Sequence, residues 1–119
     1  MAITFLDVVV NNPSNGKEGK KLNFLVDSGA IYSVVPRKTL QELKVNPVET
    51  REFQLANGKV IKRKMGVALF AFQNRKGGAP VVFGEKGDST LLGATTLEAL
   101  GMALDPLKRQ LIQLPMVLG

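Results

Sequence analysis

The stretch that decides the fold is Phe24-Leu25-Val26-Asp27-Ser28-Gly29-Ala30. Its three apolar residues predict a buried strand, and an acid, a hydroxyl and a glycine follow directly. A carboxylate at the end of a buried strand costs free energy unless hydrogen bonds or a second acid manage its charge. Gly29 lets the backbone come close, so its amide and the next one can point at Asp27. Read alone, Asp-Ser-Gly is also an ordinary turn tripeptide.

Outward from this stretch, short apolar runs separated by turn signals predict a mostly β chain. The expected strands cover residues 3–10, 22–26, 31–35, 53–56, 60–72, 81–83 and 110–114. The sharpest hairpin signal is Asn57-Gly58, where we expect a type I′ turn because both central residues of that turn need positive φ. A second, looser turn is expected over residues 75–80.

Two short helices are expected. The first, over residues 36–43, opens with a proline that suits a first helical position. The second, over residues 94–100, stops at Gly101, which favours a C-terminal cap. Leu91-Leu92-Gly93 precedes the second helix and echoes the apolar strand and glycine turn around Asp27. Two such units within one chain suggest a pseudo-twofold arrangement.

The order of these motifs resembles that of retropepsin-like aspartic proteases, and in particular their cellular, non-viral members. That family carries Asp-Thr/Ser-Gly-Ala on its active-site loop and an apolar-apolar-Gly strand beside it. The resemblance covers nearly the whole chain and implies an acid protease fold: a mostly β, closed barrel with one or two short helices. It implies one protease domain over residues 1–119, with the active site at the twofold interface of a homodimer.

The resemblance also implies roles for individual residues, with Asp27 as the catalytic group. The surrounding roles are active-site loop support by Ser28, Gly29 and Ala30, a flap over the substrate formed by Ala56, Asn57, Gly58 and Lys59, and a second-loop scaffold of Leu91, Leu92 and Gly93.

One chain supplies only half of the chemistry that this family uses. Aspartic protease catalysis needs two carboxylates that share a proton, and the chain has one Asp-Ser-Gly. The other acid near a match, Asp88, lacks the glycine. We therefore expect Asp27 to meet its symmetry mate in a homodimer, where the pair activates a water for attack on the carbonyl of an extended peptide.

The chain departs from the viral members at two positions. They carry an acid two residues beyond the motif glycine, where this chain has Ile31, and an Arg after the apolar-apolar-Gly, where it has Ala94. In the viral fold these groups pair, so losing both leaves no orphan charge. Ala30 removes one potential hydroxyl donor, and we expect activity at mildly acidic to neutral pH.

The composition excludes several other chemistries. The 119 residues include no Cys and no His, so disulfides, thiolate nucleophiles, imidazole metal ligands and Ser-His pairs are absent. No cofactor and no metal site are expected, because water is the nucleophile. The opening residues lack a secretory signal and no apolar run approaches a membrane span, so we expect a cytoplasmic protein without a membrane partner.

Two alternatives remain open at the level of sequence. The first keeps the fold without the chemistry, as a catalytically inactive peptide-binding or oligomerisation module. The second is a basic β-barrel that binds nucleic acid, suggested by the net charge of +6 and the cluster Lys59, Lys62, Arg63 and Lys64. Aromatic residues make up only 6% of the chain, so platforms for base stacking are scarce and a solvated basic face is the simpler interpretation. Lys59, Lys62 and Arg63 could instead favour acidic substrates.

The C-terminus carries an apolar edge, formed by the strand at 110–114 and the tail Pro115-Met116-Val117-Leu118. An exposed apolar strand edge invites pairing with another chain. We expect it to interleave with the N-terminal strand of a partner or to dock on its own core.

Overall fold

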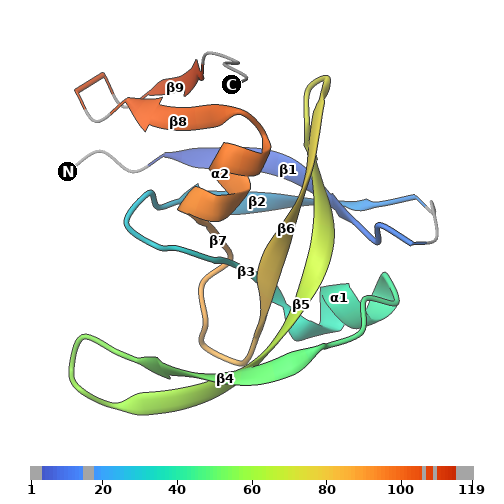
Figure 1. Ribbon diagram of the computed structural model, residues 1–119, viewed down its shortest axis with the longest axis vertical. Coiled ribbons are helices and arrows are strands. Elements are labelled where there is room, and N and C mark those ends of the chain that lie inside the picture. The colour runs from blue at the N-terminus through green and yellow to red at the C-terminus, as the bar shows by residue number, and fades with distance from the viewer. Residues whose placement is uncertain (1–3, 15–17, 106, 109, 115–119) are drawn as a thin grey trace, which may run out of the picture.

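The computed structural model describes residues 4–14, 18–105, 107–108 and 110–114 (Figure 1). Its elements in chain order are β1 (Phe5–Asn11), β2 (Lys20–Val26), β3 (Ser33–Pro36), α1 (Arg37–Glu42), β4 (Glu49–Gln54), β5 (Val60–Phe72), β6 (Arg75–Gly84), β7 (Leu91–Leu92), α2 (Ala94–Ala99), β8 (Met102–Asp105) and β9 (Gln110–Gln113).

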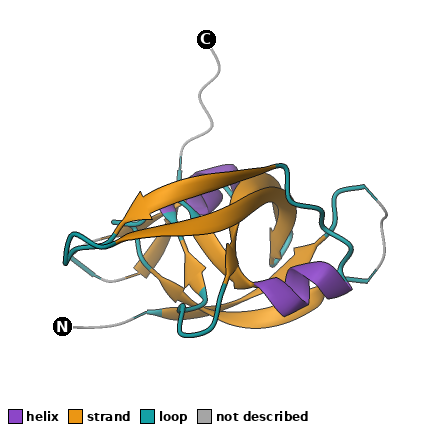
Figure 2. Ribbon diagram, turned by 90° about the horizontal axis from the view of Figure 1, so that it is seen from below, coloured by secondary structure: helices purple, strands orange, loops and turns teal. Residues whose placement is uncertain are grey.

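Seven strands form one sheet in the order β1-β2-β7-β3-β6-β5-β4. Strand β1 also pairs with β5, with Val10 opposite Phe70, and this second pairing closes the sheet into a barrel. Strand β4 pairs with β5 outside that ring. The expected mostly β, closed-barrel architecture with two short helices is confirmed. The helices follow β3 and β7 directly and lie apart on the barrel (Figure 2).

The core lies inside the barrel because the strands alternate. Val8 and Val10 of β1 are fully buried, while Asp7 of the same strand is exposed. The rings of Phe24 and Phe70 meet edge to face, with centroids 6.2 Å apart. Each such large apolar side chain contributes about 1.5–3 kcal/mol when fully buried. This packing holds β2 close to its C-terminal end, from which the loop with Asp27 begins.

The Asn57-Gly58 hairpin exists, but its expected type I′ turn is wrong. Only Gly58 has positive φ, at 86°, whereas that turn type needs two such residues. The N–H of Gly58 donates to the carbonyl of Leu55 (2.8 Å), and the N–H of Leu55 donates to the carbonyl of Lys59 (2.8 Å). The loop therefore spans three residues, with glycine in the left-handed position, and Asn57 keeps an ordinary φ while its Oδ1 accepts the N–H of Lys59.

The looser turn expected over residues 75–80 is also wrong. These residues open β6, which pairs antiparallel with β5 from Arg75 onward, and the turn lies at Gln73, whose φ is 55°. A Cβ on Gly77 would lie 2.4 Å from the carbonyl oxygen of Ala99. The glycine of this segment therefore permits close contact with α2 rather than a turn.

The C-terminal region contains one strand that the sequence pattern missed, β8. Strands β8 and β9 form an antiparallel two-stranded sheet, with Met102 opposite Gln113. Gly101 ends α2 with φ 71°, which confirms the expected glycine cap. The expected tail at 115–118 and the expected strand start at Ile3 lie outside the described residues. None of the helices within the described ranges is long and apolar enough to cross a membrane.

Candidate active site

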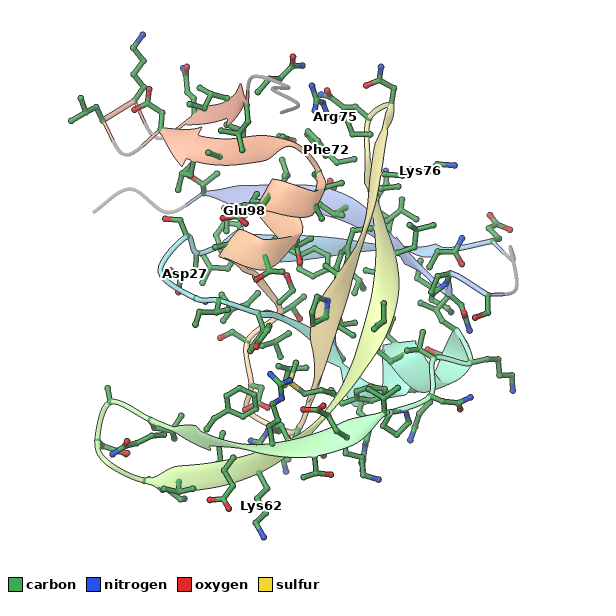
Figure 3. The ribbon with its side chains drawn as sticks, in the orientation of Figure 1. Asp27, Lys62, Phe72, Arg75, Lys76 and Glu98 are labelled. Carbon is green, nitrogen blue, oxygen red and sulfur yellow. The ribbon has the colours of Figure 1, made fainter. Side chains whose placement is uncertain are left out.

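The Asp27 loop begins where β2 ends and is held by main-chain hydrogen bonds. The N–H of Asp27 donates to the carbonyl of Leu92 (3.0 Å), and the N–H of Gly29 donates to Oδ1 of Asp27 (2.9 Å). The N–H of Ala30 donates to the main-chain oxygen of Asp27 (3.1 Å). The expected hydrogen bond from Ala30 to the carboxylate is therefore wrong. Asp27, Ser28 and Gly29 are exposed, and Figure 3 shows Asp27 at one side of the barrel.

The second expected loop lies directly beside the first. Leu91 and Leu92 of β7 pair in parallel with Leu25 and Val26 of β2. A Cβ on Gly93 would lie 2.6 Å from the carbonyl carbon and oxygen of Tyr32, a distance at which the backbone would have to move. Only glycine therefore lets the chain cross at this point.

The positions that differ from the viral proteases are joined through their backbones. The N–H of Ala94 donates to the carbonyl of Ala30 (2.8 Å), and the N–H of Thr95 donates to the carbonyl of Ile31 (3.0 Å). These bonds tie the start of α2 to the Asp27 loop without a charged pair. Ile31 has 66% of its surface exposed and contributes an apolar side chain to the loop.

A buried hydroxyl pair supports both loops from behind. Ser33 and Thr96 are fully buried, with their side-chain oxygens 2.5 Å apart. The Oγ of Ser33 also accepts the N–H of Gly93 (2.9 Å). This network joins β3, α2 and the second loop, and sequence reasoning missed it because single Ser and Thr residues give no local signal of burial.

A cavity of about 600 Å³ lies between the Asp27 loop and the β4–β5 hairpin. Its wall is formed by Gly29, Ala30, Ile31, Tyr32, Val34, Phe53, Gln54, Leu55, Ile61, Arg63, Val82, Gly87, Asp88, Ser89 and Leu91. Most of these residues are apolar, so the cavity suits uncharged, apolar groups. Asp27 precedes the first wall residue, Gly29, by two positions.

The expected flap residues do not line this cavity. Ala56, Asn57, Gly58 and Lys59 are exposed at the tip of the hairpin, which projects on the same side of the barrel as the Asp27 loop (Figure 1). The hairpin reaches the cavity wall through Phe53, Gln54, Leu55 and Ile61 instead. The structure therefore brings the two glycine-bearing loops together and keeps the hairpin tip apart from them.

Arg63 and Asp88 form a bidentate ion pair at the cavity wall, with Nε–Oδ2 at 2.7 Å and Nη2–Oδ1 at 3.1 Å. The hydrogen bond from Arg63 lowers the pKa of Asp88, with a further contribution from the N–H of Glu85, while burial opposes both. The same hydrogen bond raises the pKa of Arg63. Arg63 is therefore engaged by Asp88 and is not free to attract an acidic substrate.

Sequence reasoning also missed the contacts of the wall residue Tyr32 with Arg51 and Phe53. Nη1 of Arg51 donates to the hydroxyl of Tyr32 (2.7 Å), and Arg51 also pairs with Glu49. The ring of Tyr32 meets that of Phe53 edge to face, with centroids 6.5 Å apart. The period-2 alternation of strands could have placed Arg63 on the same face as Ile61. Its partner could not have been found, because Asp88 lies 25 residues further along the chain.

Within the described ranges, no group of three or more acidic, His or Cys residues is placed to hold a metal ion. The acidic side chains near the cavity are instead engaged as described, Asp88 by Arg63 and Asp27 by the N–H of Gly29.

Comparison with known proteins identifies the family. The profile of a family described as "gag-polyprotein putative aspartyl protease" matches residues 16–99, which is more than half of the chain. No curated protein matches. The solution structure of the simian foamy virus (mac) protease is similar with a TM-score of 0.52 and 22% identity, over 78% of this chain and 92% of that one.

A second solved structure, the foamy viral protease-reverse transcriptase in complex with double-stranded DNA, is similar with a TM-score of 0.52 and 19% identity. The match covers 78% of this chain and 15% of that one, so this chain corresponds to a small part of the viral polypeptide. At these identities the structures establish the fold, and the profile establishes the relationship. The chain belongs to the retropepsin-like, retroviral-type family of aspartyl proteases.

Proposed function

We propose that this chain is a homodimeric aspartic endopeptidase in which Asp27 of each subunit forms the catalytic pair. The observation that carries the proposal is the placement of Asp27 on an exposed loop beside an apolar cavity. Main-chain bonds to Leu92 and from Gly29 hold this acid in place. Asp88 is committed to Arg63 and is not available as a second catalytic acid.

In the proposed reaction, the two carboxylates share one proton because like charges at short distance oppose double ionisation. One carboxylate removes a proton from a water, which attacks the scissile carbonyl. The other carboxyl group donates its proton to the carbonyl oxygen. The leaving nitrogen is then protonated and the peptide bond breaks. Ser28, Gly29 and Ala30 shape the loop, while Leu91, Leu92 and Gly93 support it from the neighbouring strand.

The substrate class follows from the walls of the cavity. Apolar side chains such as Val34, Phe53 and Val82 line it, and the arginine in its wall, Arg63, is engaged by Asp88. An extended peptide with an apolar side chain near the scissile bond fits these walls. The hairpin of β4 and β5 covers the peptide, and backbone hydrogen bonds to a strand-like substrate give affinity.

The start of β1 supports a dimer interface next to the catalytic loop. The carbonyl of Thr4 accepts the N–H of Val26 (2.9 Å), one residue before Asp27. The adjacent Phe5 has 58% of its surface exposed. Covering this ring with a second copy would bury apolar surface close to Asp27, as a shared site requires.

The test is a peptide-library cleavage assay of the wild type and Asp27→Asn. We expect cleavage to be lost in this variant and to persist in Asp7→Asn, which makes the same chemical change at another exposed acid, on β1. Equal cleavage by wild type and Asp27→Asn would overturn the proposal. A wild type that binds the peptides without cleaving them would instead support the peptide-binding module.

The nucleic-acid alternative draws less support from the hairpin. Lys62 lies opposite Glu52 in the register of β4 and β5, and Arg63 turns to the other face and pairs with Asp88. Lys62 and Arg63 therefore each lie beside an acid, which reduces the net positive charge of the basic run. A salt-dependent affinity for oligonucleotides that exceeds the affinity for peptides would favour this alternative.

A further inference from the structure

The two strands of the β4–β5 hairpin carry arginines at the same register. Arg51 of β4 is the cross-strand partner of Arg63 of β5. Directly opposite residues of an antiparallel pair point to the same face of the sheet, and like charges in that arrangement repel. Each arginine therefore needs a partner of its own on the cavity side of the hairpin.

The two partners line the cavity from different loops. Arg51 reaches Tyr32, which follows the Asp27 loop, through the hydrogen bond to its hydroxyl, and its guanidinium carbon lies 5.5 Å from the ring centroid. Arg63 reaches Asp88 in the loop between β6 and β7. The carboxylate of Asp88 also accepts the N–H of Glu85 (2.8 Å), so the loop holds this acid from its own backbone.

Burial along the hairpin ends soon after these contacts, toward the tip. Phe53 and Ile61, the next inward pair, are half-buried, whereas every residue from 54 to 60 is exposed. Lys62 has its side chain directed away from the body of the molecule (Figure 3). The hairpin is thus attached to both cavity loops at the Arg51–Arg63 register, and beyond Phe53 and Ile61 it extends without further burial.

We propose that Arg51 and Arg63 are positioning residues that clamp the base of the hairpin across the cavity, so that only residues 54–60 swing aside to admit a peptide. This inference rests on the proposed function for its substrate. The clamp, defined as Arg51 with Tyr32 and Arg63 with Asp88, acts through the position of the hairpin and does not touch the reacting atoms. It confines opening to the overhanging segment and keeps the apolar wall residues Phe53 and Ile61 in place.

Hydrogen exchange tests the clamp without any need for activity. In the wild type, amides of residues 54–60 should exchange faster than those of residues 49–53 and 61–65. Asp88→Asn keeps the shape of the side chain but removes its charge, and exchange in the two base segments should rise about tenfold, as expected for losing a hydrogen bond between charged groups. Tyr32→Phe keeps the ring, removes the hydroxyl, and should raise exchange in residues 49–53.

The matched control is Lys62→Met, which removes a positive charge from the outward face of the same strand and should leave the base segments unchanged. Unchanged exchange in both Asp88→Asn and Tyr32→Phe would overturn the clamp. So would a rise in the base segments that steepens with added denaturant as much as exchange in β1 and β2 does, because the base segments would then report only global unfolding.

Kinetics separates failure of the clamp from failure of the proposed function. If the wild type cleaves peptides, Asp88→Asn should raise KM about tenfold with little change in kcat. The reason is that the lower part of the β4–β5 hairpin would no longer hold Phe53 and Ile61 against the substrate. The control should keep the KM of the wild type. If the wild type does not cleave peptides, the proposed function fails while the exchange result still decides the clamp. Cleavage with a KM unaltered by Asp88→Asn would count against the clamp alone.

Discussion

At the scale of single residues, the candidate site depends on polar groups whose partners lie far away in sequence. Ser33 and Thr96 are 63 positions apart, yet each satisfies the other inside the barrel. Their network also reaches the N–H of Gly93, so all three groups are paired despite burial. An unsatisfied buried polar group costs about 1–3 kcal/mol, which explains why these side chains occur together.

The Arg63–Asp88 pair makes stability depend on pH in a defined direction. The pKa of Asp88 is lower in the folded protein than its ordinary value of 3.8, chiefly because Arg63 donates a hydrogen bond to it. A lowered pKa contributes stability that is fully present above the unfolded-state value and is lost as pH falls through the folded-state value. We therefore expect Asp88→Asn to destabilise the protein at neutral pH by about 1–2 kcal/mol.

The measurement is the unfolding free energy of wild type and Asp88→Asn from pH 7 to pH 2. The difference between the two proteins should stay constant down to about pH 4 and then shrink, because Asp88 is protonated first in the unfolded chain and only at lower pH in the folded protein. A difference that grows on acidification would contradict this assignment of the ion pair.

At the scale of elements, the site is made by one strand-to-helix connection crossing one loop. Gly93 joins β7 to α2 and passes against Tyr32, while the first N–H groups of α2 bind the carbonyls of Ala30 and Ile31. The crossing leaves no room for a side chain at Gly93. This explains why an apolar pair followed by glycine occurs at that point of the sequence.

Gly93→Ala tests this crossing. The added methyl group would meet backbone atoms at 2.6 Å, which cannot yield as a flexible side chain does, so we expect a loss of about 3 kcal/mol in unfolding free energy. The matched control is Gly78→Ala in β6, whose new Cβ would find its nearest atom at 4.0 Å. The control should change stability by less than about 1 kcal/mol. Denaturant unfolding of both variants checks this, and equal losses would refute the argument.

At the scale of the whole molecule, the proposed enzyme is completed only by a second copy. A single chain presents one Asp27 beside its cavity, and the exposed Phe5 lies close to that loop. A site shared by two identical chains makes activity depend on protein concentration. It also makes activity sensitive to the partner with which each subunit is paired.

Subunit mixing tests the shared site directly. When wild type is mixed with an equal amount of Asp27→Asn and the subunits are allowed to exchange, about half of the wild-type subunits should sit in mixed dimers that lack one carboxylate. Activity per wild-type subunit should therefore fall to about half, and dilution below the dimer dissociation constant should lower it further. Additive activity, independent of both mixing and dilution, would contradict a site formed by two chains.

The features that could be predicted from sequence are those with local signatures. The apolar run before Asp27, the hairpin glycine and the cap at Gly101 all reflect conformations that a few neighbouring residues determine. The turn expected over residues 75–80 failed for the opposite reason. Gly77 in this segment permits the close contact with Ala99 of α2, which no local pattern reveals.

The sequence alone determined the β class of the chain, the order of its glycine-bearing motifs and the family resemblance that marks Asp27 as the acid of interest. The tertiary structure decided which residues far apart in the sequence pair with one another. Arg63 finds Asp88, Arg51 finds Tyr32, and Met102 finds Gln113 only after the barrel closes. The physical reason is that strand periodicity and turn preferences act between neighbours, whereas the partners of charged and buried polar groups are set by distances in the folded chain.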